Sequence, residues 1–359
     1  MLMRIMVSAL LTCLSAFGGV TYTLTDLGFY EARGLSANGN VAGDSGGDGV
    51  LYSAGTTKDI GSLGSSSTYG WAVNDSGQAA GWSYNFFSRQ QAFVYSNGAM
   101  TGLQSLGGLY SAAFSIDAAG DAVGWASTPG QYNLKHASMW KAGSTTATDL
   151  HTVIGATGAI SEAAGINNNG WVTGQAVFDS GYRAFIWTGS STQVLGTLPG
   201  DVFSFGTSIN QSGQVAGYST NSSYQDRAFV TNSQNQLISI GTLGGASSYA
   251  LGINDLGSVV GDSNNSSNSQ HGFLFSGGVL SDLNTLLANA SGWTVTAAYS
   301  INDAGQIAGI ATNASGAQRA VLLNPNGPTA TPEPGTLLLL SAGLIGIALF
   351  KRRRANEAA

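Results

Sequence analysis

The chain has 359 residues, of which only 9% are charged and 52 are glycine, and its net charge at pH 7 is −6. Between Thr21 and Ala330 it has eight Lys and Arg residues against 17 Asp and Glu residues, which excludes the basic surface that a nucleic-acid-binding protein needs. Aromatic and β-branched residues recur along the whole chain, so the composition excludes ordinary disorder and favours a folded, turn-rich β protein.

Residues 1–18 have the features of a secretory signal peptide. Arg4 supplies a positive start, Ile5–Leu14 an apolar core, and the small residues around Phe17 a cleavage site. Cys13, the only cysteine, falls inside this segment. A lipoprotein would acylate this cysteine, but the residue before it fits that pattern poorly. We therefore expect the segment to be removed and the exported chain to have no disulfide.

One unit occurs seven times between residues 19 and 328. Aligned on a turn, the copies read "GLSANGNVAGDS" (34–45), "AVNDSGQAAGWS" (72–83), "SIDAAGDAVGWA" (115–126), "GINNNGWVTGQA" (165–176), "SINQSGQVAGYS" (208–219), "GINDLGSVVGDS" (252–263) and "SINDAGQIAGIA" (300–311). The turn glycines are Gly39, Gly77, Gly120, Gly170, Gly213, Gly257 and Gly305. A period of about 44 residues is typical of repeat architectures.

Each unit has the pattern of four short strands. In Ile-Asn-Asp-x-Gly the Asn accepts a backbone hydrogen bond, the next two residues suit a type I turn, and Gly suits the left-handed position. The following x-Val-Ala-Gly is a return strand, Ala-Phe-x-Trp alternates like a third strand, and x-Asp-Leu-Gly ends a fourth. The sequence therefore predicts an all-β fold, a seven-bladed β-propeller over residues 19–328. A β-solenoid, which would need shorter coils, is the alternative.

The start of the repeat region indicates how the ring closes. If each blade runs from one turn motif to the following Asp-Leu-Gly, the seventh blade lacks its fourth strand. The segment "TYTLTDLG" (21–28) is then left over. We expect it to complete the seventh blade and to cover an otherwise open sheet edge.

Two further segments recur in the units. One is Asp-Leu-Gly and its variants, as at 26–28 and 59–61; the other reads "QAFVY" (91–95), "HASMW" (136–140), "RAFIW" (183–187), "RAFVT" (227–231), "HGFLF" (271–275) and "RAVLL" (319–323). This set resembles the bacterial extracellular HAF repeat family over nearly all of residues 21–325. The resemblance implies an extracellular location and a repeat architecture, and it implies no particular activity.

The pentapeptide GDSGG at 43–47 also surrounds the nucleophile of chymotrypsin-like proteases. Ser45 has equivalents in the other copies, at Ser83, Ser219 and Ser263. The protease order requires a histidine before the serine, and the first histidine here is His136. We therefore expect Ser45 not to be a nucleophile.

The sequence shows no other catalytic or metal-binding constellation, and we predict no cofactor and no enzymatic activity. Histidines are too few for a metal cluster: His136 and His271 head the third strand, where other copies have Asp, Gln or Arg. The acidic turns, at Asp75, Asp255 and Asp303, suggest calcium, but each has one carboxylate where a calcium loop needs several, so turn capping is the favoured reading. No carboxylate pair of the kind that glycosidases use stands out.

One column of the repeat is a candidate ligand site. The residues directly after the return-strand glycine are Asp44, Trp82, Trp125, Gln175, Tyr218, Asp262 and Ile310. Equivalent positions in a propeller lie on one circle, and aromatic faces beside polar groups suit sugar rings. The alternative is that these side chains pack between blades.

Residues 329–359 have the features of a sorting signal. The motif Pro332, Glu333, Pro334 is followed by an apolar run, Leu337–Phe350, and then by the basic residues Lys351, Arg352, Arg353 and Arg354. As a helix this run spans about 21 Å, short of the roughly 30 Å hydrocarbon core, which suits a transient membrane anchor. The set resembles the PEP-CTERM signal, which implies cleavage by an exosortase in Gram-negative bacteria that make exopolysaccharide. A plain membrane anchor is the alternative.

Together these features predict an exported cell-surface or extracellular-matrix protein that passes through an inner-membrane intermediate. We expect a structural or glycan-binding role, with exosortase and exopolysaccharide as partners. The alternative function is a secreted polysaccharide-degrading enzyme on the same scaffold.

Overall fold

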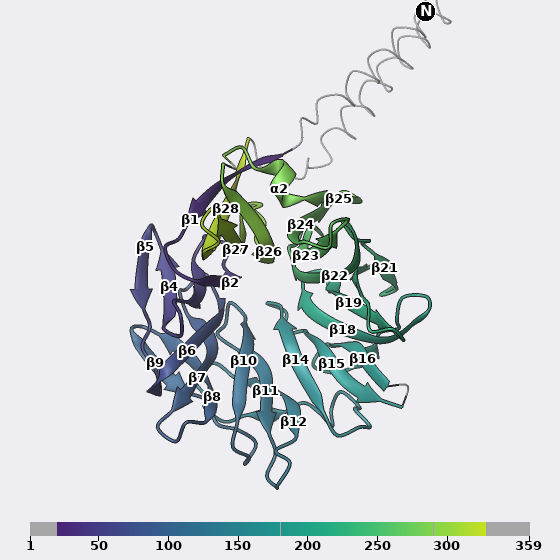
Figure 1. The fold of residues 1–359 in the computed structure, drawn as a ribbon. Helices are drawn as coiled ribbons and strands as arrows, with labels where there is room; N and C mark the ends of the chain where they lie inside the picture. Colours follow the sequence, from purple (N-terminus) through teal and green to yellow (C-terminus); the bar gives the residue numbers. More distant parts are fainter. Residues whose placement is uncertain (1–19, 180, 290, 328–359) are drawn as a thin grey trace, which may run out of the picture. The chain divides into compact units, whose positions relative to one another are not determined.

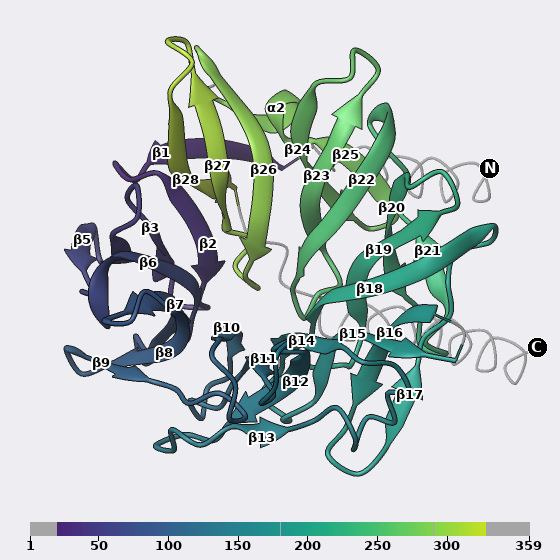
Figure 2. The same ribbon diagram turned by 60° about the horizontal axis from the view of Figure 1, so that its bottom comes forward.

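The chain folds into a seven-bladed β-propeller. The structure, a computed structural model, describes residues 20–179, 181–289 and 291–327. Seven four-stranded sheets stand around a common axis (Figures 1 and 2), which confirms the predicted fold and excludes the solenoid. The chain divides into two units, Met1–Pro325 and Asn326–Ala359. The predicted signal peptide and sorting segment lie outside the described residues.

The first six blades each take four consecutive strands, which run from the axis outward. Blades one to three comprise β2 (Glu31–Leu35), β3 (Val41–Asp44), β4 (Gly49–Ser53) and β5 (Thr56–Asp59); β6 (Gly64–Val73), β7 (Ala79–Asn85), β8 (Gln90–Ser96) and β9 (Ala99–Gly102); β10 (Ser111–Ile116), β11 (Ala122–Ser127), β12 (Lys135–Trp140) and β13 (Thr148–Asp149). Blades four to six comprise β14 (Ser161–Ile166), β15 (Val172–Phe178), β16 (Gly181–Trp187) and β17 (Thr192–Val194); β18 (Asp201–Ile209), β19 (Val215–Asn221), β20 (Asp226–Thr231) and β21 (Leu237–Ser239); β22 (Gly244–Ile253), β23 (Val259–Asn265), β24 (Gln270–Ser276) and β25 (Val279–Asp282). A short helix, α2 (Leu283–Leu286), follows the sixth blade.

The seventh blade joins the two ends of the repeat region. Its sheet has the order β26 (Trp293–Ile301), β27 (Ile307–Asn313), β28 (Gln318–Asn326) and β1 (Thr21–Asp26). The N–H of Leu27 donates to the carbonyl of Ala320 at 3.0 Å, and Tyr22 and Leu24 are buried in the core of this blade. The predicted closure by the N-terminal strand is confirmed.

The antiparallel order of the strands gives the propeller two different faces. The turn face carries the hairpins between the first and second strands, which are the Ile-Asn-Asp-x-Gly motifs. The loop face carries the hairpins between the second and third strands and the connections from one blade to the next. In a turn-face hairpin, the Asn210 carboxamide accepts the N–H of Gln214 at 2.9 Å and Gly213 has φ +80°, as the motif predicts.

The return-strand glycine is required because two strands approach closely. A Cβ on Gly217 would lie 2.0 Å from the carbonyl oxygen of Phe205, on the neighbouring inner strand. The fully buried Phe229 of the third strand lies opposite this glycine and fills the space above it. The same clash, at 1.8–2.2 Å, exists in every blade, at Gly43, Gly81, Gly124, Gly174, Gly217, Gly261 and Gly309. This fit explains why Val-Ala-Gly and Ala-Phe recur together in the sequence.

Candidate functional site

Polar side chains of the turn face join neighbouring blades. The Asn210 carboxamide donates to the carbonyl of Asn254 at 3.1 Å, Asn254 donates to Asn302 at 3.0 Å, and Asn302 donates to Ser36 at 3.1 Å. The turn asparagines therefore donate hydrogen bonds from one blade to the next along this part of the ring. These groups stabilise the propeller and are already satisfied.

The carboxylates of the acidic turn residues also join neighbouring blades. Asp75 accepts the N–H of Asn38 at 3.0 Å, and Asp255 accepts that of Gln211 at 2.8 Å. Asp303 accepts the N–H of Asp255 at 2.8 Å. Burial, followed by the nearby Asp303 carboxylate, raises the pKa of Asp255. Each carboxylate caps the turn of the preceding blade, in agreement with the turn-capping interpretation.

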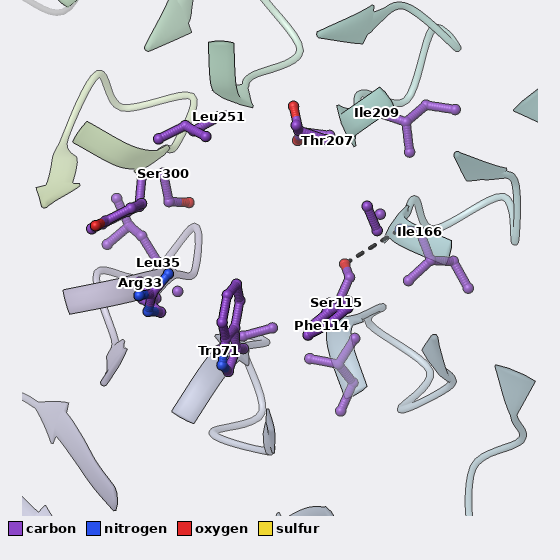
Figure 3. A pocket seen from close by; sticks show the side chains of 18 of the residues that line it. Arg33, Leu35, Trp71, Phe114, Ser115, Ile166, Thr207, Ile209, Leu251 and Ser300 are labelled. Atoms are coloured by element: carbon purple, nitrogen blue, oxygen red, sulfur yellow. Dashed lines mark hydrogen bonds between the residues drawn. The ribbon is translucent and has the colours of Figure 1, made fainter. Parts of the chain in front are cut away.

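The innermost strands line a cavity of about 180 Å³ on the axis (Figure 3). Arg33 lies in its wall, with the guanidinium 4.1 Å from the ring of Trp71 and 4.8 Å from that of Tyr299. Glu31 accepts from the Arg33 guanidinium at 2.8 Å and from the Tyr299 hydroxyl at 2.9 Å. Figure 3 shows Arg33, Trp71 and Phe114 along one arc of the wall. The cavity therefore has one aromatic, charged side.

The cavity is lined by three consecutive columns of the repeat, and the first of them holds its charged and aromatic side chains, which the sequence did not predict as a site. Six positions before each turn glycine stand Arg33, Trp71, Phe114, Ala164, Thr207, Leu251 and Tyr299. The composition of this column could have indicated the site. It has one charged residue and three aromatic residues, and its other members are small or aliphatic. The column lies on the innermost strand of each blade, which faces the axis.

The predicted ligand ring lies on the second strand of each blade, at one level. Trp82 contacts the ring of Tyr69 at 4.2 Å, and Tyr218 contacts those of Phe205 at 4.9 Å and Tyr249 at 5.1 Å. Lys135 lies over the Trp125 ring at 4.3 Å, and the Gln175 carboxamide donates to Glu162 at 2.9 Å. Asp44 accepts the N–H of Gly47 at 3.2 Å, and Asp262 accepts from the Gln270 carboxamide at 2.8 Å. Asp44, Trp125, Asp262 and Ile310 are buried, whereas Trp82, Gln175 and Tyr218 are half-buried. The six polar and aromatic members thus have partners within the propeller, and their ligand role stays a prediction.

Asp262 has a buried carboxyl group whose charged form destabilises the folded state. Its side chain is buried, and burial raises its pKa to about 6, although the Gln270 carboxamide donates to it. Because the folded-state pKa lies above the unfolded value of about 3.9, the folded state gains stability as pH falls from about 6 to about 4. Above pH 6 the buried charge is destabilising.

Asp262→Asn is therefore expected to stabilise the protein at pH 7.5 by about 2–3 kcal/mol, and by close to nothing at pH 4. Urea unfolding at the two pH values measures the difference. Asp48→Asn, at an exposed carboxylate in the turn after β3, is the control. An equal gain at both pH values would show that the charge of Asp262 is not the cause.

The exposed aromatic side chains of the described residues all lie on the loop face. They occur in the hairpins between second and third strands or in the connections between blades, at Tyr30, Phe86, Phe87, Tyr110, Tyr132 and Tyr224, and at Tyr84 near the end of β7. On the turn face the exposed large apolar side chains are aliphatic, such as Leu256 and Val279. Among the described residues, the exposed aromatic rings are thus confined to one face of the propeller.

The residues that the sequence analysis weighed for catalysis or metal binding lie in different blades. Ser45 lies in the exposed turn after β3, where its N–H donates to the carbonyl of Asp48. Its equivalent Ser83 is fully buried and accepts the N–H of Leu63. His136 and His271 each bind the aspartate of their own fourth strand, Asp149 at 2.8 Å and Asp282 at 2.7 Å. Within the described ranges, no three His, Cys, Asp or Glu side chains form a group that could hold a metal ion.

Comparison with known proteins identifies the motif in the C-terminal segment. Residues 330–354 match the model of the PEP-CTERM protein-sorting motif. The chain carries an exosortase sorting signal. The signal implies export to the cell envelope and processing by an exosortase. The apolar run Leu337–Phe350 lies outside the described residues, and within those described no helix is long and apolar enough to cross a membrane.

Solved structures share the fold at low sequence identity, and no curated protein matches the chain. A prolyl endopeptidase is 10% identical, with 86% of this chain and 51% of that chain covered and a TM-score of 0.50. TolB from Acinetobacter baumannii is 14% identical, with 89% and 68% covered and a TM-score of 0.45. The BP39L lectin from Burkholderia pseudomallei is 11% identical, with 86% and 98% covered and a TM-score of 0.44. The chain spans about half the length of the endopeptidase, and the likeness is one of fold.

Proposed function

We propose that this exported protein binds glycan at the cell surface through the loop face of its propeller. The observation that carries the proposal is the confinement of the exposed aromatic side chains to that face. Aromatic rings stack on the C–H faces of sugars, while neighbouring amides and hydroxyls bind the sugar hydroxyls. A glycan of the extracellular matrix, an exopolysaccharide, is the ligand that fits an envelope location.

Charge is consistent with a ligand that is not strongly anionic. The central region has more than twice as many acidic as basic residues. A polyanion would be repelled by such a surface at low ionic strength. A neutral or weakly charged polysaccharide is therefore the proposed class.

The sorting signal indicates where the protein would bind its ligand. We propose that an exosortase cleaves near Pro332, Glu333 and Pro334 after removal of residues 1–18, so that the propeller reaches the surface without either terminal segment. The role is one of binding within the matrix, with no catalytic step.

Replacing Phe86, Phe87 and Tyr132 by Ser is expected to abolish retention of the protein on exopolysaccharide extracted from its native host. Each lost stacking contact is worth about 0.5–1.5 kcal/mol beyond its area, so the three together weaken binding roughly 10-fold to 1000-fold. The melting temperature is expected to change little, because all three side chains are exposed.

The matched control replaces two exposed apolar residues of the turn face, Leu256→Ser and Val279→Ser. This variant is expected to be retained like the parent protein. Equal retention of the loop-face variant and the parent protein would contradict the proposal.

A further inference from the structure

The hairpin between β19 and β20 holds an aromatic residue in a conformation that disfavours it. Tyr224 has φ +58°, in the left-handed region where the Cβ of an L residue crowds the following carbonyl oxygen. Its side chain is 78% exposed. Among the described residues, no hydrogen bond or ring contact involves its side chain. Burial and bonding therefore do not offset the backbone strain.

The hairpin itself does not require a tyrosine. The hairpins after β7, β23 and β27 have the same backbone hydrogen bonds, and the equivalent residues there are Ser88, Asn268 and Gly316. In the β19–β20 hairpin, the N–H of Tyr224 donates to the carbonyl of Asn221 at 3.0 Å, as Ser88, Asn268 and Gly316 donate to theirs. Asn and Gly adopt the left-handed region readily. A strained residue that the local structure does not explain points to function.

The base of this hairpin is rigid. The Asp226 carboxylate accepts from the Thr220 hydroxyl on the facing strand and from the Tyr249 hydroxyl of the next blade. The Asn221 carboxamide accepts the N–H groups of Ser223 and Gln225. Tyr224 therefore stands on a fixed support, and a ligand that contacts its ring does not have to order the loop first.

The tip is polar but uncharged. Ser222, Ser223 and Gln225 flank Tyr224 and are exposed. The Gln225 carboxamide accepts from Asn221 through Oε1, and its amide nitrogen has no partner among the described residues. An aromatic ring beside hydroxyl and amide groups, with no free charge, suits a neutral sugar better than an ionic ligand.

We propose that Tyr224 forms a glycan subsite on which the C–H face of a neutral pyranose stacks. The inference rests on the proposed function and deepens it, because it names one subsite and the class of sugar. The ring supplies the stacking surface, and Gln225 and the two serines bind the hydroxyls. The strained backbone is retained because it presents the ring to solvent.

Tyr224→Asn, which installs the residue of the sixth blade, tests the inference. We expect the melting temperature to rise by about 2 °C because the strain is relieved, and retention on host exopolysaccharide to fall about tenfold. Ser88→Asn is the matched control, since it has the same hairpin position and φ +55°. It is expected to raise the melting temperature and to leave retention unchanged, and Tyr224→Phe is expected to keep retention within about threefold of the parent, since stacking uses the ring.

A second probe separates this inference from the proposed function. Saturation-transfer NMR with methyl glucopyranoside and methyl galactopyranoside, and with glucuronic acid as the charged comparison, reports binding of single sugars. Loss of the neutral-sugar signal in Tyr224→Asn supports the subsite even if the parent protein is not retained on exopolysaccharide, a result that would count against the proposed function alone. The subsite is overturned if Tyr224→Asn binds like the parent, if it melts earlier, or if the parent binds neither of the two neutral glycosides.

Discussion

Deleting Thr21–Gly28 is expected to unfold the whole propeller and not only its seventh blade. The deletion removes the buried side chains of Tyr22, Leu24 and Leu27. Each loss of a large buried side chain costs about 2–5 kcal/mol, so the sum approaches the roughly 5–15 kcal/mol that stabilises a typical protein. The edge of β28 would also lose its partner strand and expose unpaired backbone groups.

Thermal unfolding followed by circular dichroism measures this effect. Addition of a peptide with the sequence of residues 20–30 is expected to restore folding, because it can occupy the vacant edge as an added strand. The same peptide with Leu24→Asp is the control and is expected to fail, since it would place a carboxylate where the Leu24 side chain is buried in the core of the seventh blade. A deletion variant that melts at the parent temperature would show that the N-terminal strand does not close the ring.

Gly217→Ala is expected to lower the melting temperature strongly although it adds one methyl group. The new Cβ would lie 2.0 Å from the carbonyl oxygen of Phe205, and the Phe229 ring leaves no room on the other side. Since backbone has to move by more than an ångström, we expect a cost of about 3 kcal/mol or more and a fall of at least about 6 °C.

Gly196→Ala is the matched control. A Cβ there has no atom within 4 Å, and no positive φ is needed. We expect this variant to be as stable as the parent or slightly more stable, because alanine restricts the unfolded chain. If Gly217→Ala unfolds at the same temperature as Gly196→Ala, the close approach of the two strands does not explain why glycine recurs at this position.

The blades and their closure could be predicted because the repeat encodes them locally. The turn glycine and the polar residue before it, which is asparagine in five copies, fix each hairpin. The return-strand glycine, opposite phenylalanine in four copies, fixes how successive strands pack. Residues 21–28 belong to no complete repeat, and the only blade without a fourth strand is the seventh. The segment was therefore predicted to pair there, beside β28. Such features depend on residue type and spacing, which the sequence states directly.

The surroundings of the ring positions could not be predicted in the same way. Alignment of the copies places Trp125 and Tyr218 at one level, but it does not say that second-strand side chains pack against neighbouring strands and blades. Trp125 is buried beneath Lys135 for that reason. The contact of Arg33 with Tyr299 also depends on ring closure, since the two residues are far apart in sequence.

The strained Tyr224 is invisible to sequence reasoning for a related reason. Left-handed positions are normally recognised by Gly or Asn, and a tyrosine gives no such signal. Only the backbone geometry, together with the equivalent hairpins, identifies it.

Hydroxyl-radical footprinting of the protein with and without host exopolysaccharide tests the central claim most directly. We expect Phe86, Phe87, Tyr132 and Tyr224 on the loop face to become protected, while Leu256 and Val279 on the turn face stay as reactive as in the free protein. Protection of the turn-face residues, or no protection at either face under conditions where exopolysaccharide is in excess, would contradict a glycan-binding loop face.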